Sequence, residues 1–196
     1  MKYWIDLEYI PQLLDPISLA IVAEDGREYL AQFIEAKWQW ADEFVQSEVI
    51  PQLSRCTHER YWQSLQHEKE SHSTGRCAND CPWDFAPRVA SVLRDFCDPV
   101  RYGPPQFWTD CGAFDYVLVS QLFGNFSDWP AGWPFYFNDL QQWADQLAVP
   151  LPEQPGGQHQ ALADARHNQV CWDFLHFYEN RTRMIRPPST LQIGYR

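Results

Sequence analysis

The first third of the chain alternates hydrophobic and polar residues with the period of β-strands. Bulky apolar and polar residues alternate from Lys2 to Glu8, and Ile17–Ala23 is an apolar run rich in β-branched residues. Asp25-Gly26 is a strong signal for a two-residue hairpin turn, and Glu28–Ile34 supplies a returning strand. The pattern therefore predicts a three-strand antiparallel meander.

Apolar residues beyond the meander recur mostly at helical spacing. Asn138 is a plausible N-cap for one of the predicted helices, and Gln106–Thr109 is predicted to be a short aromatic strand. Gly124-Asn125 marks the end of another helix. The predicted helices are Trp38–Val49, Phe85–Phe96, Ala113–Phe123, Asp139–Leu147 and Gln160–Asn180.

This order of elements predicts one α/β domain over residues 1–180. Its mixed sheet would join the antiparallel three-strand meander to parallel strands and would be flanked by helices. The ribonuclease H-like architecture has this shape, although element order alone leaves other α/β folds open. Residues 54–82 form a polar insertion with a predicted helix over Glu59–Lys69, and residues 181–196 form an arginine-containing tail without acids.

Composition narrows the classes of function. The 196 residues carry a formal net charge of −11, which argues against a protein that holds nucleic acid mainly by a basic surface. An enzyme whose metal ions supply positive charge remains compatible with it. The N-terminus does not read as a signal peptide, and the longest apolar run is too short to span a bilayer, so we expect a cytoplasmic protein without membrane contact.

The cysteines of the polar insertion allow two interpretations. Cys56, His58, Cys77 and Cys81 could bind zinc, with His67 and His72 as further ligands, but their spacing matches no standard zinc motif. The alternative is an insertion with reduced thiols, because disulfides are rare in proteins without an export signal.

Asp6 and Glu8 are the first candidates for chemistry. Residues two apart in a strand project from the same face, and two neighbouring carboxylates repel each other unless a cation binds between them. An exposed strand with two solvated acids is the alternative explanation.

Two further sites carry acids or a histidine. Asp115 follows the aromatic strand at the start of a helix, where ligands of α/β sheets collect, although helix dipoles also favour an acid there. His159 lies before the long helix and Asp164 lies about one and a half turns later, which fits a general base beside a metal site. The alternative is a helix-entry histidine and an Asp paired with a neighbouring arginine.

Together these residues form the pattern Asp-x-Glu, Asp, His-x-x-x-x-Asp, which resembles the DEDDh group of 3′–5′ exonucleases. Four segments resemble the mycobacterial-type DEDDh 3′–5′ exoribonuclease family in particular. They are Tyr3–Ile10, Ile21–Tyr29, Gly112–Tyr116 and Ala161–Arg166. The resemblance covers most of residues 2–180 and implies a ribonuclease H-like fold.

The resemblance implies a function and a set of site residues. Asp6, Glu8, Asp115 and Asp164 would hold two Mg²⁺ or Mn²⁺ ions, for which carboxylate oxygens are suitable ligands. His159 would take the proton of the attacking water, since imidazole titrates near neutral pH. The chain would then release nucleoside 5′-monophosphates from the 3′ end of RNA. Candidate contacts to the terminal nucleotide are Leu7, Tyr9, Trp108 and Phe114, with core packing as the alternative for the aromatic ones.

Two other functions remain open at this point. One is a 3′–5′ exonuclease on single-stranded DNA, because the contact that reads the 2′-hydroxyl is local. The other is a non-catalytic nucleic-acid-binding adaptor on the same fold, against which the intact set of five residues speaks. The resemblance also suggests a homodimer, for which the Trp129–Pro134 loop offers a partner surface.

Overall fold

A mixed six-stranded sheet forms the centre of the computed structural model, which describes residues 1–54 and 81–185. The strand order is β4-β3-β2-β1-β5-β6, with β1 antiparallel to β2, β2 antiparallel to β3, and parallel pairs β1/β5, β3/β4 and β5/β6. The strands are β1 Lys2–Ile10, β2 Asp15–Ala23, β3 Glu28–Phe33, β4 Trp83–Asp84, β5 Gln106–Thr109 and β6 Asn138–Asp139. The predicted α/β class, with an antiparallel meander joined to parallel strands and flanking helices, is confirmed.

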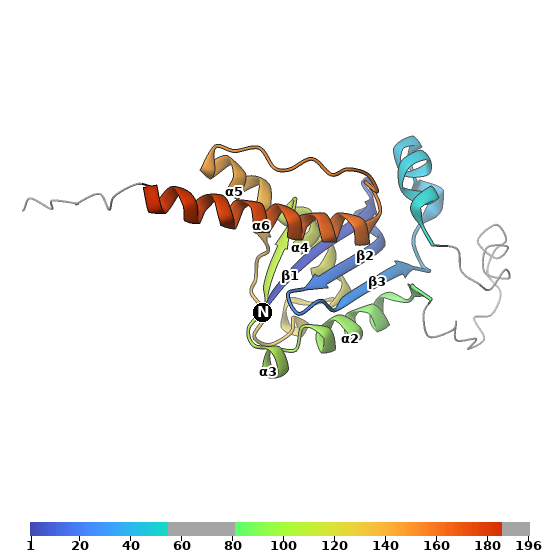
Figure 1. Cartoon of the computed structure of the whole chain (residues 1–196). Helices are drawn as coiled ribbons and strands as arrows, with labels where there is room; N and C mark the ends of the chain where they lie inside the picture. The colour runs from blue at the N-terminus through green and yellow to red at the C-terminus, as the bar shows by residue number, and fades with distance from the viewer. Residues whose placement is uncertain (55–80, 186–196) are drawn as a thin grey trace, which may run out of the picture.

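Helices cover both faces of this sheet (Figure 1). The long helix α6 crosses one face above β1 and β2, while α2 and α4 pack against the other face. The helices are α2 Ala86–Phe96, α3 Pro99–Tyr102, α4 Gly112–Leu122, α5 Leu140–Leu147 and α6 Ala161–Ile185.

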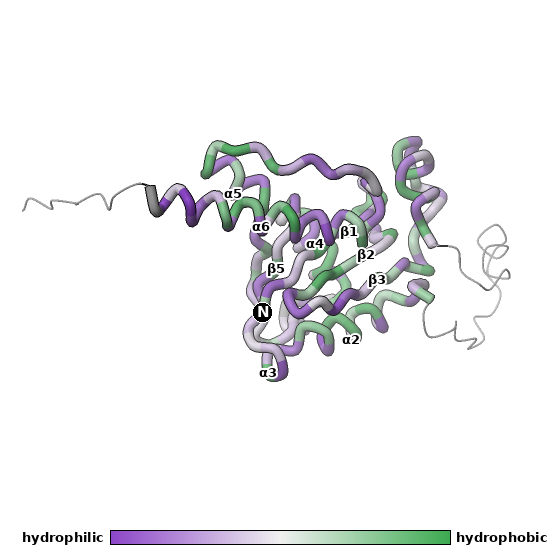
Figure 2. Tube along the Cα trace, in the orientation of Figure 1, coloured by the Kyte–Doolittle hydropathy of each residue, from purple (hydrophilic) through white to green (hydrophobic). Residues whose placement is uncertain are grey.

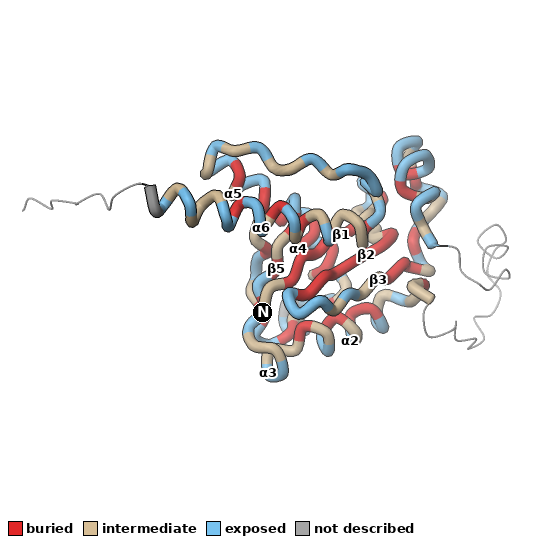
Figure 3. Tube along the Cα trace, in the orientation of Figure 1, coloured by how far each residue is buried: buried red, intermediate tan, exposed pale blue. Residues whose placement is uncertain are grey.

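The strand period of two divides the residues of β1 between two cores. Tyr3, Ile5 and Leu7 are buried on the side of α2 and α4, whereas Trp4 packs with Ala161 and Ala165 of α6. Hydrophobic residues follow β2 and α2, and hydrophilic residues mark the turn between β2 and β3 (Figure 2). Buried residues follow the central strands of the sheet, among them β2 (Figure 3). Asp6 and Glu8 continue the α6 side of β1 beyond Trp4.

The hairpin between β2 and β3 lies where the sequence predicted it, but its loop has three residues instead of two. Ala23 N–H donates to Arg27 O at 2.8 Å, which leaves residues 24–26 in the loop. Gly26 adopts a φ of +87°, a value that favours glycine, and its N–H donates to Ala23 O at 2.9 Å. The Asp25 side chain accepts from Arg27 N at 3.2 Å. The predicted helices Phe85–Phe96 and Ala113–Phe123 are also present, each within one residue of its predicted bounds.

The single helix predicted over Trp38–Val49 is wrong. The chain forms a 3₁₀ turn at Trp38–Trp40, a π-helical segment at Val45–Val49 and a 3₁₀ turn at Ile50–Gln52. Ala41 is extended between the first two, and the Asp42 carboxylate accepts from Val45 N at 2.9 Å, which starts a new helical segment. A local side-chain hydrogen bond thus interrupts the helix that the apolar spacing indicated.

Three smaller predictions also need correction. Asp139, not Asn138, caps α5: its carboxylate accepts from Gln142 N at 2.8 Å, while the Asn138 amide donates to Phe107 O. Helix α6 continues to Ile185, beyond the predicted end at residue 180. Trp133 of the Trp129–Pro134 loop is buried in the core, and Trp129 packs against it, so these two rings do not form an open partner surface.

Other predictions concern residues outside the described ranges. Cys56, His58, His67, His72 and Cys77 belong to them, as do the predicted helix over 59–69 and most of the tail. Over residues 1–54 and 81–185, no helix combines the length and the apolar character that crossing a membrane requires.

Candidate active site

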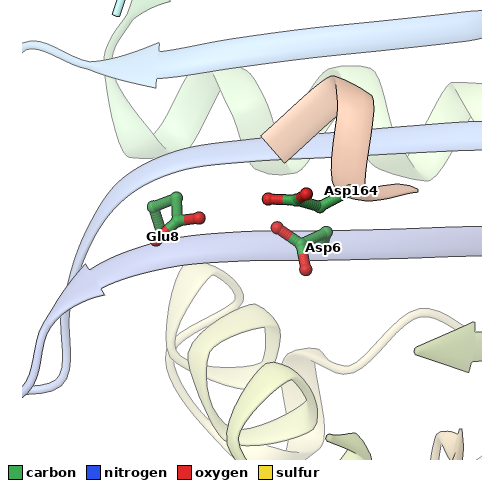
Figure 4. Close-up of side chains that lie close together, drawn as sticks. All are labelled: Asp6, Glu8 and Asp164. Atoms are coloured by element: carbon green, nitrogen blue, oxygen red, sulfur yellow. The ribbon is translucent and has the colours of Figure 1, made fainter. Parts of the chain in front are cut away.

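Three of the four predicted acids meet between β1 and the first turns of α6. Asp6 and Glu8 project from β1, and Asp164 projects toward them from α6 (Figure 4). One carboxylate oxygen from each lies within 4.8 Å of the other two. We call these residues the acidic cluster. The strand period places Asp6 and Glu8 on one face of β1, as the sequence predicted, and the structure shows that α6 covers this face.

A β-bulge lies directly after the two acids of β1. The register between β1 and β2 shifts between Glu8 and Tyr9, so that Glu8 pairs with Ser18 and Tyr9 pairs with Pro16. Bulges bend a strand and redirect its side chains, and they are frequent beside active sites. Here the extra residue is Ile17 of β2, so the irregularity lies in the strand that pairs with the acidic end of β1.

Asp115 approaches the cluster from the opposite face of the sheet. It lies in the first turn of α4 and is 6% exposed. Its carboxylate accepts hydrogen bonds from the Thr109 hydroxyl and from the Leu7 backbone N–H. Its charge raises the pKa of the Asp6 carboxyl, and after burial it is the strongest such influence. Asp115 is therefore near enough to Asp6 to influence its ionisation, but it lies outside the set of three oxygens within 4.8 Å.

Burial and mutual repulsion raise the pKa values of these acids. Burial raises the pKa of Glu8 to about 8 and that of Asp115 to about 7, with neighbouring carboxylates adding to both. The pKa of Asp6 is raised well above its ordinary value by burial and by Asp115, Glu8 and Asp164. The pKa of Asp164 is also raised by burial, against hydrogen bonds that favour its charged form.

The acidic cluster has no lysine or arginine partner in the described part of the chain. The lysines and arginines that form ion pairs there do so with carboxylates outside it, namely Glu24, Asp25, Asp15, Asp84, Glu28 and Glu179. Asp6 Oδ2 is buried and has no hydrogen-bond partner. Close carboxylates, one of them with an unpartnered buried oxygen, can supply the oxygen ligands that hard divalent cations such as Mg²⁺ or Mn²⁺ prefer.

His159 lies at the open side of the acidic cluster. Its Nδ1 is 3.8 Å from Glu8 Oε1, and its side chain is 40% exposed. The ring also packs nearly perpendicular to that of Phe44, with centroids 4.9 Å apart and an interplanar angle of 85°. Phe44 is a neighbour that sequence reasoning missed, because the segment was expected to be one regular helix.

The connector before α6 holds His159 in a defined backbone conformation. His159 has a φ of +63° and Gly157 a φ of +77°, and a Cβ on Gly157 would lie 3.1 Å from Ala163 Cβ. Gln154 Nε2 donates to Asp164 Oδ1 at 2.6 Å and to Gly156 O at 3.2 Å. Asp164 thus fastens the connector that carries His159.

The four predicted substrate contacts differ in their surroundings. Phe114 is 47% exposed and stacks on Tyr9, with centroids 6.0 Å apart and an interplanar angle of 22°. Trp108 packs against Trp143 and Trp172, and the Leu7 side chain is 5% exposed within the core. Only Tyr9 and Phe114 therefore combine a position beside the acids with an accessible ring.

The chain has relatives with assigned activity. It matches the family described as "3'-5' exoribonuclease Rv2179c-like domain" over residues 1–176. Two curated proteins of Mycobacterium tuberculosis are similar to it: 3'-5' exoribonuclease Rv2179c of strain H37Rv and 3'-5' exoribonuclease MT2234.1 of strain CDC 1551. Each is 29% identical over 169 residues, which are 85% of this chain and 88% of the relative.

Proposed function

Because the chain belongs to the Rv2179c-like 3′–5′ exoribonuclease domain family, we propose that it removes nucleotides from the 3′ end of RNA by metal-dependent hydrolysis. The observation that carries this proposal is the acidic cluster with its unpartnered Asp6 oxygen, which has no lysine or arginine partner among the described residues. A purely structural cluster of buried acids would be expected to have cationic partners.

Asp6, Glu8, Asp115 and Asp164 would hold two divalent ions, Mg²⁺ or Mn²⁺. When bound, such ions activate the attacking water and stabilise the leaving 3′ oxygen. Hydrogen bonds from Thr109 and Leu7 orient the carboxylate of Asp115. A hydrogen bond from Gln154 orients that of Asp164. These hydrogen bonds restrict the side chains without adding charge, which suits ligands that must meet at one point.

His159 would act as the general base of the DEDDh type. Its exposed ring beside Glu8 can accept a proton from water that reaches the open side of the cluster. The attack on phosphorus breaks the bond to the 3′ oxygen, so the product is a nucleoside 5′-monophosphate and the shortened strand keeps its 3′-hydroxyl. The Phe44 ring packs against the imidazole from one side.

The stacked pair Tyr9–Phe114 would hold the terminal nucleotide. Aromatic rings bind unpaired bases by stacking without reading their sequence, which suits an enzyme that trims varied ends. Phe114 comes directly before Asp115, so a base that contacts this ring lies next to the acids.

A labelled-RNA assay tests the proposal. With Mn²⁺, 3′-labelled single-stranded RNA should release labelled mononucleotide at once, while 5′-labelled RNA should shorten in single-nucleotide steps. Chelation with EDTA and the Asp164→Asn variant should both abolish cleavage, with the variant retaining its circular dichroism spectrum. A matched DNA strand distinguishes the two nucleic acids, and faster removal of deoxynucleotides would contradict the assignment to RNA. Cleavage that persists in EDTA would contradict the metal site.

A further inference from the structure

The edge of β1 beside the acidic cluster is completed by side chains instead of a strand. β5 pairs with β1 only at Lys2, Tyr3 and Trp4. Farther along this edge, Asn168 of α6 donates from Nδ2 to Ile5 O at 3.0 Å, and Asp115 of α4 accepts from Leu7 N–H. The two backbone groups that flank Asp6 are therefore held by side chains from helices on opposite faces of the sheet.

Asn168 lies on the face of α6 that carries the metal-binding acid. It follows Asp164 by four residues, which is about one turn, and is 4% exposed. Ala161 and Ala165 lie on this same face and are buried against Trp4, Ala20 and Val22 of the sheet. These small residues let the backbone of α6 approach the sheet closely, and Asn168 makes the polar contact of this face with β1.

Repulsion within the acidic cluster acts on the position of α6. Asp6 and Glu8 belong to β1 and Asp164 belongs to α6, so like charges between them favour separation of the helix from the strand. The ion pair Arg166–Glu28 also joins α6 to the sheet, but its side chains are 56% and 34% exposed, where such pairs contribute little. The buried amide contact is better placed to resist this separation, because an unpaired Ile5 carbonyl in the interior would be costly.

We propose that Asn168 is a positioning residue: by fixing α6 to Ile5, it sets the spacing between Asp164 and the two acids of β1, and thereby the affinity for divalent cations. The inference rests on the proposed function, since it assigns Asn168 to the same metal site. An asparagine fits this role because its amide donates at every pH and carries no charge. An acid there would add to the repulsion, and a lysine would compete with the metal ion.

The test compares Asn168→Leu, which keeps the branching at Cγ but removes the donor, with Leu175→Ala. Leu175 is fully buried on the same helix and lies outside the acidic cluster, so its truncation lowers stability without removing the contact to β1. Calorimetric titration with Mn²⁺ alone should show about 10- to 100-fold weaker binding for Asn168→Leu and unchanged affinity for Leu175→Ala. In RNA hydrolysis at fixed Mn²⁺, Asn168→Leu should lower kcat far more than it raises KM.

The outcomes separate this inference from the proposed function. If the parent protein binds Mn²⁺ and trims RNA, and Asn168→Leu binds Mn²⁺ with parental affinity, the positioning role is wrong while the function stands. If the parent protein neither binds Mn²⁺ nor trims RNA, the proposed function fails and the inference with it. Should Asn168→Leu not fold, Asn168→Ala is measured in its place, since it admits water to the carbonyl and is expected to show the same loss of affinity.

Discussion

Without a bound cation, the acidic cluster should make the protein less stable as the pH rises. Burial raises the pKa of the Glu8 carboxyl from 4.5 to about 8, so the folded protein retains a proton that the unfolded chain releases. The contribution of Glu8 to the free energy of unfolding is therefore greatest below about pH 4.5, and it declines as the pH rises to about 8. Asp115, whose pKa is raised to about 7, acts in the same direction.

The structure sets the size of this effect. Since a change of one pKa unit corresponds to about 1.4 kcal/mol, the raised pKa of Glu8 corresponds to about 5 kcal/mol of unfolding free energy. The protons of Asp6, Glu8 and Asp115 are shared within one coupled site, so the contributions are not additive. Water also reaches the site beside His159, which is 40% exposed, and we expect about half of the Glu8 value. For a domain of this size, the ~2–3 kcal/mol of the whole pH span lowers Tm by roughly 5–10 °C, and about half of this decrease falls between pH 6 and pH 8.

Thermal unfolding followed by circular dichroism at pH 6 and pH 8, in EDTA and in Mn²⁺, measures the effect. In EDTA, Tm should fall between the two pH values by more than in the Asp6→Asn variant, which lacks one of the acids whose raised pKa makes folding bind a proton. In Mn²⁺ the parent protein should lose most of this pH dependence, because the cation favours the ionised acids. Asp173→Asn removes an exposed acid of α6 and serves as the control. A parent Tm in EDTA that is equal at both pH values, or an Asp6→Asn variant with the parental slope, would refute the reasoning.

Three further substitutions test the assigned roles. His159→Ala should lower kcat by at least 100-fold while calorimetric Mn²⁺ affinity changes less than threefold, since the ring is assigned to proton transfer. Thr109→Val, nearly isosteric, should weaken Mn²⁺ binding about tenfold because Asp115 loses the hydroxyl that orients it. Phe114→Ala should raise KM for RNA by roughly 5- to 100-fold through lost stacking with a smaller change in kcat, and an unchanged KM would exclude the ring from substrate binding.

The local part of this site could be predicted from the sequence. A strand period of two places Asp6 and Glu8 on one face wherever β1 forms, and Asp164 belongs to the start of a helix whose apolar spacing is clear. Asp115 could be located after β5 for the same reason. The positions of these residues could be predicted because they follow from the type of element, strand or helix, that carries each residue.

The remaining features depend on contacts between distant parts of the chain. Asn168 reads as an ordinary polar residue of a helix, and its contact with Ile5 exists only because β5 leaves the edge of β1 after Trp4. Trp108 was a reasonable candidate for stacking on a base, but Trp143 and Trp172 enclose it once α5 and α6 are in place. The segment around Phe44 has the apolar spacing of one helix. Its backbone conformation differs because backbone N–H groups of this segment donate to the carboxylates of Asp15 and Asp42.

The distribution of charge along the chain explains why neutral groups, and not lysine or arginine, donate hydrogen bonds around the acidic cluster. Between Tyr102 and Ala165 the sequence has no lysine or arginine, so the chain surrounding Asp115 and His159 offers no cation of its own to the acidic cluster. The fold instead supplies neutral donors: the Thr109 hydroxyl, the Leu7 N–H and the Gln154 amide orient the acids, and the Asn168 amide fixes the helix. Neutral donors restrain carboxylates without neutralising them, whereas a lysine in the same place would occupy the position of a metal ion. In the proposed metal site, this arrangement would favour binding of divalent cations at the expense of metal-free stability.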